Sequence, residues 1–420
     1  MLGDGNCRSD LHRASVKIGC RLLVIGWWLD RWRLATSYWL SAATITLLAA
    51  SVLGLTSVAS AQTSLTSRQG PALKPRVLSA PVRVCAGGDV TLGTNLDTIW
   101  AKHAADTLWR QFGIRPDPDS IAPSLKPFLA GADLVLLNIE GAIGAGPAPR
   151  KCGPKSTSCF AFRQPPNAAS ALRKLADSTV SIVGNVANNH SHDAGPDGRE
   201  ATIAQLDSAG IRVTGADTLA TAVALSSGDT IGVLGFYTDS LTPDARDLRA
   251  VRRHVARAVE QYGTVIVTMH LGAEGPTAQR TRNATERFLR INRGNPVGFA
   301  DAAFAGGATL VIGHGPHVLR AAEWRGDRLA LYSLGNLLTY GPFKLREPTN
   351  RGAIACATID SARFVSHAEL RPTMQVWPGV LLADSTKRAW RLIDSLSALD
   401  FPRTGATVDT TGAIGKRKRP

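Results

Sequence analysis

Short apolar segments alternate with longer amphipathic segments along most of this chain. The segments 167–176, 198–209 and 246–262 place their apolar residues at helical spacing. Between them lie runs with the length and β-branched content of buried strands: PVRVCA (81–86), ADLVLLN (132–138), TVSIVGNVA (179–187), DTIGVLGF (229–236), GTVIVTMH (263–270) and ATLVIGH (308–314). Strands that alternate with helices predict an α/β domain with substantial sheet content.

The pattern changes after residue 319. Residues 320–336 read as two strands joined by a turn at Arg325-Gly326-Asp327, residues 353–376 continue with strand-like runs, and one helix is expected near 384–397. We therefore expect a domain over 81–345 and a strand-rich extension of it over 346–400. The basic tail 401–420, which ends in KRKRP, is expected to be disordered, and the polar segment 62–80 is expected to be a linker.

The first 61 residues have the layout of an export leader. Arg31 and Arg33 precede a nearly continuous apolar stretch over 42–58, and Ala59-Ser60-Ala61 matches a cleavage site. An uncleaved membrane anchor is the alternative, because the apolar stretch is long for a signal peptide. We expect an exported protein of the periplasm or cell envelope, which an uncleaved leader would hold at the membrane.

The charge indicates an anionic partner. The net charge is +15, which favours acidic polymers or surfaces. No zinc-finger, RRM or helix-turn-helix signature accompanies it, and export removes nucleic acid as a partner. An anionic envelope polymer or a phosphoester substrate is the better expectation.

Six cysteines occur, two of them in the leader. Cys152 and Cys159 bracket the polar loop CGPKSTSC, and in an oxidising compartment we predict a disulfide between them. Two free thiols are the alternative. Cys85 and Cys356 lie in apolar runs and are expected to be buried in the core.

Five of the predicted strands end in side chains that suit a metal ion. Because the carboxyl ends of strands in α/β sheets meet at one edge, these side chains can converge on one site. Carboxylates, amide oxygens and imidazoles are ligands for manganese, zinc or iron, so the pattern predicts one or two divalent ions. The strand-end groups are Asp89, Asn138 with Glu140, Asn188-Asn189-His190, His270 with Glu274, and His314 with His317.

Each of these signals is weak when taken singly. Asp89 could cap a turn, Asn189 could cap a helix, His190 could lie in a surface loop and His270 could be a core histidine. His314 and His317 flank Gly-Pro, which can bring both imidazoles to one side of a tight turn. The order of the whole set, rather than any one member, carries the prediction.

The same residues carry a family resemblance over roughly residues 82–340. The blocks GDVTLGTNLD, NIEGAI, GNVANNHSHDAG, HLGAEG and GHGPHVLRAAEWRGDRLALYSLGNLL occur in this order. The chain resembles the CapA family of poly-gamma-glutamate capsule-synthesis proteins, within the metallophosphatase superfamily. The resemblance implies a four-layer α/β/β/α sandwich of the calcineurin-like type.

The resemblance also implies roles for single residues. Asp89 matches the first aspartate of the family pattern, and Glu140 matches the acidic residue expected to bridge two metals. Asn189, His270 and His314 match ligands of one metal, and His317 matches a ligand of the other. His190 matches the histidine that protonates the leaving oxygen or steadies the phosphoryl group.

Three departures from the family pattern bear on the site. Val90 and Thr91 follow Asp89 where Asp-x-His is usual, so one metal lacks a histidine and a mononuclear site is an alternative. Gly315 stands where His is frequent, which would loosen the metal site. Leu271 stands where Trp is frequent, which would reshape the substrate pocket.

Two functions follow from these observations. The first is a metal-dependent hydrolase of a phosphoester or related bond in cell-envelope or capsule polymer metabolism, with His190 as general acid. The second is a non-catalytic envelope protein that binds an anionic capsule polymer and assists its export or attachment. Candidate substrate contacts are Arg163, Asn138, Asn188 and Glu274, although Arg163 could also be a solvated loop charge.

Overall fold

A computed structural model describes residues 77–146, 151–152 and 159–418, which belong to one compact unit. The predicted leader over 1–61 and most of the predicted linker lie outside the described residues. Within these ranges no helix is long and apolar enough to cross a bilayer.

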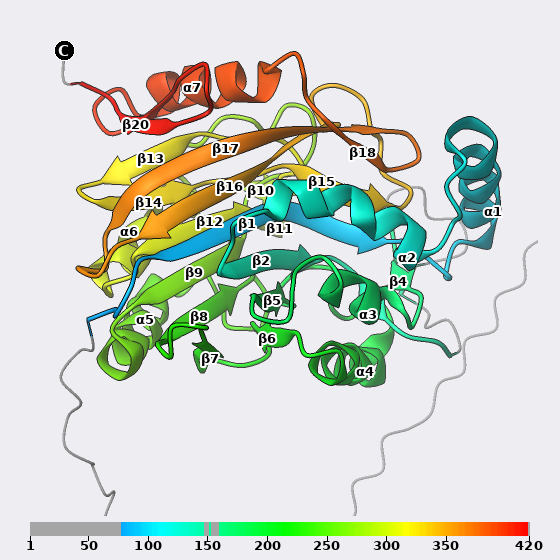
Figure 1. Ribbon diagram of the computed structural model, residues 1–420, viewed down its shortest axis with the longest axis horizontal. Coiled ribbons are helices and arrows are strands. Elements are labelled where there is room, and N and C mark those ends of the chain that lie inside the picture. The colour runs from blue at the N-terminus through cyan, green and yellow to red at the C-terminus, as the bar shows by residue number, and fades with distance from the viewer. Residues whose placement is uncertain (1–76, 147–150, 153–158, 419–420) are drawn as a thin grey trace, which may run out of the picture. The chain divides into compact units, whose positions relative to one another are not determined.

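Two β-sheets pack face to face (Figure 1). The first sheet has the order β18-β17-β16-β1-β2-β5-β6, with β15 pairing alongside β1. Its strands are β1 Val82–Leu92, β2 Leu134–Ile139, β5 Ser181–Asn185, β6 Arg212–Thr214, β15 Asn336–Tyr340, β16 Arg351–Ile359, β17 Val365–Val376 and β18 Val380–Ala383.

The second sheet has the order β13-β14-β12-β9-β8-β7. Its strands are β7 Thr221–Ala224, β8 Thr230–Phe236, β9 Val265–His270, β12 Leu310–His314, β13 Ala322–Arg325 and β14 Arg328–Leu331. Two short ladders pair β3 Ala142–Ile143 with β4 Arg163–Gln164, and β10 Arg287–Phe288 with β11 Ile291–Asn292.

Helices cover the outer face of each sheet. The first sheet carries α1 Thr98–Thr107, α2 Pro118–Ile121, α3 Ala168–Arg173 and α4 Gly195–Ser208, with a π-helix at Leu108–Phe112 and a 3₁₀ segment at Ala122–Leu129. The second sheet carries α5 Leu248–Tyr262 and α6 Pro296–Ala305.

Strand periodicity builds the layers, because alternate side chains of a strand face opposite sides. Val84 and Ala86 of β1 lie in the core between the sheets, whereas Cys85 faces the helices of the first sheet. In β9, Ile266 faces the inner core and Val267 faces α5 and α6. The expected four-layer α/β/β/α sandwich is confirmed.

Parallel pairing gathers the carboxyl ends of the central strands at one edge. β1, β2, β5 and β6 run parallel, as do β8, β9 and β12. Asp89 pairs in register with Asn138 and with Asn336, and His270 pairs with His314.

A close approach of two backbones fixes Asp89 in place. A Cβ at Gly88 would lie 1.8 Å from the carbonyl oxygen of Gly335, so only glycine fits there. The Asp89 amide donates to that same carbonyl at 3.1 Å. The Gly87-Gly88 pair therefore lets β15 reach the site edge.

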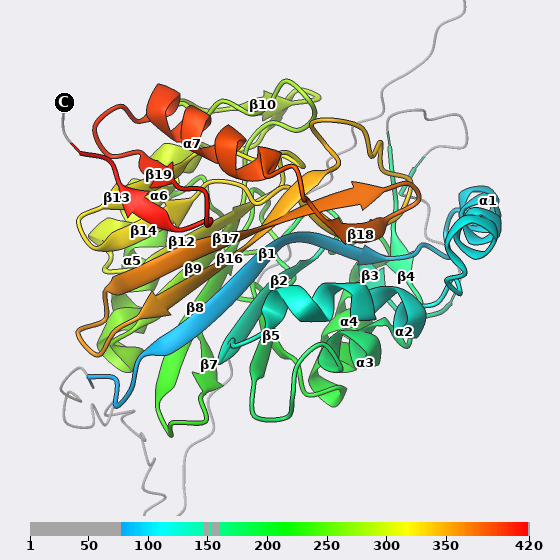
Figure 2. The ribbon, with the colours of Figure 1, turned by 45° about the horizontal axis from the view of Figure 1, so that its top comes forward.

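The C-terminal segment corrects one expectation. The tail 401–420 was expected to be disordered, but its described part, 401–418, forms a hairpin of β19 Ala406–Val408 and β20 Ile414–Lys416 beside α7 Arg388–Asp400 (Figure 2). Ala406 and Ile414 are buried in the inner core, and Trp324 Nε1 donates to the Gly415 carbonyl at 3.0 Å. These two apolar side chains hold the segment against the core. The basic residues at its end led to the prediction of disorder.

The cysteines form two disulfides. Cys152 is joined to Cys159, as the spacing predicted. Cys85 and Cys356, expected only as core residues, are buried and also joined to each other across β1 and β16. Their pairing was missed because 271 residues separate them and only sheet register brings them together.

Candidate metal centre

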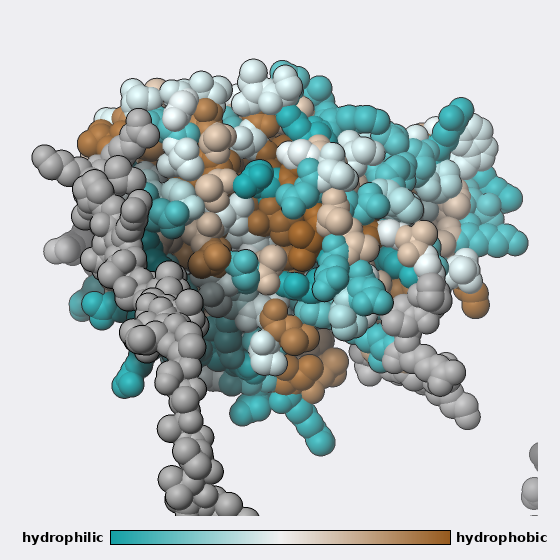
Figure 3. All heavy atoms as spheres, turned by 90° about the horizontal axis from the view of Figure 1, so that it is seen from below, coloured by the Kyte–Doolittle hydropathy of each residue, from teal (hydrophilic) through white to brown (hydrophobic). Residues whose placement is uncertain are grey.

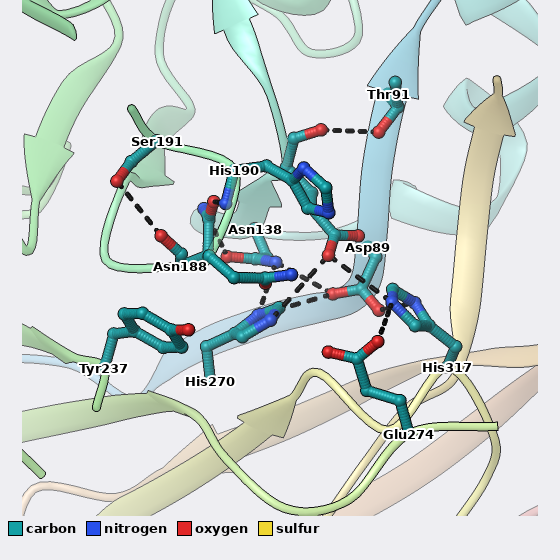
Figure 4. Close-up of polar contacts among 12 residues, drawn as sticks. Asp89, Thr91, Asn138, Asn188, His190, Ser191, Tyr237, His270, Glu274 and His317 are labelled. Atoms are coloured by element: carbon teal, nitrogen blue, oxygen red, sulfur yellow. Dashed lines mark hydrogen bonds and ion pairs between the residues drawn. The ribbon is translucent and has the colours of Figure 1, made fainter. Parts of the chain in front are cut away.

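Three buried ligand groups from separate strands form the centre of the site. One ligand atom each from Asp89, Glu140 and His270 lies within 4.8 Å of the others. Asp89 lies in β1, Glu140 directly follows β2, and His270 ends β9, so both sheets contribute. Figure 4 shows Asp89 and His270 converging with His317 and Glu274.

His317 closes the cluster from the loop after β12. Its Nδ1 lies 3.0 Å from Asp89 Oδ2 and 2.9 Å from Asn336 Oδ1, and its Nε2 lies 3.5 Å from Glu140 Oε1. His317 has φ of +58°, which a non-glycine residue rarely adopts. Such strain persists where the surrounding structure holds a residue for its function.

Several buried ligand atoms have no hydrogen-bond partner within the described part of the chain. They are both carboxylate oxygens of Glu140, Asn189 Oδ1, His270 Nε2, and both ring nitrogens of His314. Buried polar atoms are nearly always hydrogen-bonded, so a cluster without partners requires an explanation. Oxygen and imidazole donors of this kind fit a divalent ion such as manganese, zinc or iron.

Electrostatics support the same assignment. Burial, together with the negative charge of Asp89, holds the pKa of Glu140 well above its usual range. Burial also lowers the pKa of His270 well below its usual value and lowers that of His314 to about 4. Both imidazoles are therefore neutral at pH 7, which is the form that binds metals.

Interactions between opposite charges oppose the effect of burial on the pKa values of His317 and Asp89. Burial disfavours the His317 cation, but Glu140 and Asp89 outweigh it and raise the pKa of His317 to about 10. Burial likewise opposes ionisation of Asp89, but the hydrogen bond and charge of His317 outweigh it and lower the pKa of Asp89. A cationic His317 thus balances the buried negative charge of Asp89.

A histidine–aspartate pair lies beside these ligands, in the loop after β5. His190 Nδ1 is 2.6 Å from Asp193 Oδ2. Asp193 is fully buried, accepts from the Phe162 amide at 2.7 Å, and pairs with Lys151. The pair fixes the ring of His190 by its Nδ1 and leaves its Nε2 for other chemistry.

Two predicted substrate contacts belong instead to the scaffold. Asn138 is fully buried, and its amide nitrogen donates to Asp89 Oδ1 at 2.8 Å and faces His270 Nδ1 at 3.1 Å. Asn188 is equally buried and donates to the Ile139 carbonyl at 2.9 Å, while accepting from the His190 amide. Both amides are committed to holding ligands, so neither is free to contact substrate.

The other two predicted contacts also differ from each other. Arg163 is 7% exposed and donates to Asn95 Oδ1 at 2.8 Å and to the Gly146 carbonyl, so it braces a loop. Glu274 lies at the site, with Oε2 at 3.9 Å from His317 Nε2 and Oε1 at 2.9 Å from Arg293. Of the four predicted substrate contacts, Glu274 is the one that lies at the rim of the cluster in a position to meet a substrate.

The departures from the family pattern have local explanations. Thr91, which stands where a histidine was expected, donates from Oγ1 to the Glu140 carbonyl at 2.6 Å. A Cβ at Gly315 would lie 3.0 Å from the His270 ring, so the glycine leaves no gap there. Leu271 is buried in the outer core against α5 and α6, so it does not reshape a pocket.

Sequence reasoning missed the residues that support the ligands. Asp193 was visible three positions after His190, a spacing that places both side chains on one turn. Asn336 and Arg293 carried no local signal, because only β15 pairing and the loop after β9 bring them to the site. Arg293 also donates to Tyr237 Oη at 3.0 Å and so ties two site loops together.

Comparisons with known protein families give one match. The family model for bacterial capsule synthesis protein PGA_cap matches residues 83–340. No curated protein matches the sequence significantly.

Solved structures give distant matches. A 5'-nucleotidase precursor from Thermus thermophilus is 11% identical, with a TM-score of 0.33 over 77% of this chain and 59% of that one. GAP50, the anchor in the inner membrane complex of Plasmodium, is 10% identical, with a TM-score of 0.32 over 75% of this chain and 95% of that one. The chain thus spans about three fifths of the nucleotidase precursor.

Proposed function

The chain belongs to the bacterial capsule synthesis protein family PGA_cap, and from this premise we propose that it is a metal-dependent hydrolase. The bond cleaved is a phosphoester or a related bond in cell-envelope or capsule polymer metabolism. The observation that carries the proposal is the coincidence of two features at one strand edge: buried ligand atoms without partners among the described residues, and the His190–Asp193 pair beside them.

The ligand set would hold at least one divalent ion. Asp89, Glu140, Asn189, His270 and His314 supply the donor atoms, and His317 lies next to both carboxylates. When bound, a divalent ion supplies positive charge that polarises a phosphoryl oxygen and favours ionisation of water.

The residues of the chain then supply the proton. Asp193 accepts from Nδ1 of His190, so the ring presents Nε2, the atom that would carry the proton to a leaving oxygen. A purely binding protein has no need of such a pair. This pair therefore favours catalysis over the alternative of polymer binding alone.

We also propose that the protein acts outside the cytoplasm. The leader expected over 1–61 and the two disulfides support an oxidising compartment. We therefore expect the enzymatic activity to be found in that compartment and not in the cytoplasm.

The test is turnover of phosphoesters by metal-loaded protein. We expect His190→Ala to lower kcat by about 10²–10⁴-fold, with metal content unchanged. Asp193→Asn should also lower kcat. His192→Ala is the matched control, because His192 is a histidine of the same loop whose Nδ1 lies 3.0 Å from Ser191 Oγ.

Two results would contradict the proposal. One is a wild-type protein that holds metal but cleaves no phosphoester, amide or polymer. The other is full activity in His190→Ala. Retained affinity for an anionic polymer without cleavage would instead support the non-catalytic alternative.

A further inference from the structure

A small hairpin next to the metal centre combines exposed aliphatic and basic residues. β10 and β11 are joined by a turn at Leu289-Arg290, and Leu289 and Ile291 are 59% and 53% exposed. Arg282, Arg287 and Arg290 are also exposed, and none of them forms an ion pair within the described ranges. Figure 2 shows the hairpin at the margin of the sandwich.

The two central residues of this turn both have positive φ, and neither is a glycine, which would adopt that conformation easily. Leu289 has φ of +47° and Arg290 has φ of +67°. Two-residue turns of this kind favour Asn-Gly or Gly-Gly, because both central residues adopt positive φ. The turn therefore carries two bulky residues at a backbone cost, which points to a use for their side chains.

The base of the hairpin is rigid. Glu286 accepts from Arg320 at 2.8 Å and from the Ala273 amide at 2.7 Å. Arg293, at the other end, pairs with Glu274 at 2.9 Å. The tip is therefore fixed relative to the metal centre, since Glu274 is also 3.9 Å from His317.

We propose that the segment 282–292 docks the metal centre onto the surface of an anionic lipid bilayer. Leu289 and Ile291 would enter the region between headgroups and acyl chains, and the three arginines would contact the phosphates. The loop after β8, which follows a strand parallel to β9, also exposes an aliphatic side chain, Leu241, by 62%.

A bilayer fits these residues better than a protein partner does. A stable protein interface buries about 800 Å² on each partner, usually around a well-packed apolar centre. Two exposed aliphatic side chains, with arginines near them in the sequence, are too few for that. On the face seen from below (Figure 3), hydrophobic residues lie in groups among hydrophilic ones.

The experiment is hydrogen exchange of the full-length protein with and without lipid vesicles. The readout is local to residues 282–292, so binding through another part of the chain does not produce it. We expect exchange there to slow on phosphatidylglycerol vesicles and to stay unchanged on phosphatidylcholine vesicles. The proposal does not depend on hydrolysis, so a failed turnover assay leaves it standing.

Two pairs of variants test which side chains are responsible. Leu289→Ser/Ile291→Ser should abolish the protection, whereas Ile99→Ser/Leu219→Ser, at exposed aliphatic residues of other segments, should keep it. Arg287→Gln/Arg290→Gln should lower vesicle partitioning by about fivefold for each charge removed. Arg249→Gln/Arg252→Gln on α5 removes equal charge from exposed residues and should have a smaller effect.

Several outcomes would overturn the proposal. Unchanged exchange of the wild-type hairpin on phosphatidylglycerol would do so without any variant. Protection by soluble polyglutamate or polyphosphate, but not by vesicles, would assign the hairpin to a polymer. Equal losses in the α5 variant would assign binding to net charge alone.

Discussion

At the scale of single residues, the candidate metal ligands were easier to find in the sequence than the residues that support them. Asp89, Glu140, His270 and His314 lie at or just after the ends of apolar runs, so strand periodicity and side-chain chemistry pointed to them as a set. The roles of the residues that support these ligands could not be predicted in this way. Asn138 and Asn188 were recognised as polar strand-end residues, but their hydrogen bonds to Asp89 and Ile139 exist only once β1 and β2 pair.

Asp384 offers a prediction about pH and stability. Burial opposes its ionisation, but hydrogen bonds from Thr386, the Ala389 amide and Arg351 outweigh burial and hold its pKa below the usual value. Arg351 Nη1 lies 2.8 Å from its carboxylate. A lowered folded-state pKa gives stability that is present above the unfolded pKa of about 3.9 and lost as pH falls through the folded value.

Asp384→Asn should therefore lower the free energy of unfolding by about 1–3 kcal/mol at pH 7. The difference from wild type should shrink as pH falls below about 4. Urea unfolding at several pH values measures it, with Asp197→Asn at an exposed site as the control. A difference that does not change with pH would show that charge is not the cause.

At the scale of elements, prediction succeeded where the signal was local. The strands β1, β2, β5, β8, β9 and β12 all coincide with runs chosen for their apolar content. Bonds between elements that are distant in the sequence were harder to predict. Cys85 and Cys356 were both placed in the core, yet only the antiparallel register of β1 and β16 puts them opposite each other.

The C-terminal hairpin provides a test of element packing. Ile414 is 5% exposed and lies in the inner core with Ala406. Ile414→Ala should lower the free energy of unfolding by about 2–5 kcal/mol, because it removes buried methyl groups and leaves a cavity.

Ile99 is the matched control, since it is 86% exposed on α1. Ile99→Ala should change the free energy of unfolding by less than about 0.5 kcal/mol. Equal effects of the two substitutions in urea unfolding would mean that β20 does not pack as described.

At the scale of the whole molecule, alternation of strands and helices indicated the fold class but not the second sheet. Nothing in the periodicity of β8 or β9 states that they leave the sheet of β1 and form another. The four-layer arrangement came from the family resemblance, and the division of Val84 and Cys85 between two cores confirms it. Two sheets were needed to bring Asp89 and Glu140 against His270 and His314.

The most direct measurement is the transition-metal content of the purified full-length protein by plasma mass spectrometry. We predict at least about one ion per chain in wild type and in His103→Ala/His367→Ala, whose histidines are exposed. Asp89→Ala/His314→Ala, if folded by circular dichroism, should lose it. If wild type holds no metal even after exposure to manganese, zinc and iron, the metal centre and the proposed hydrolase are both wrong.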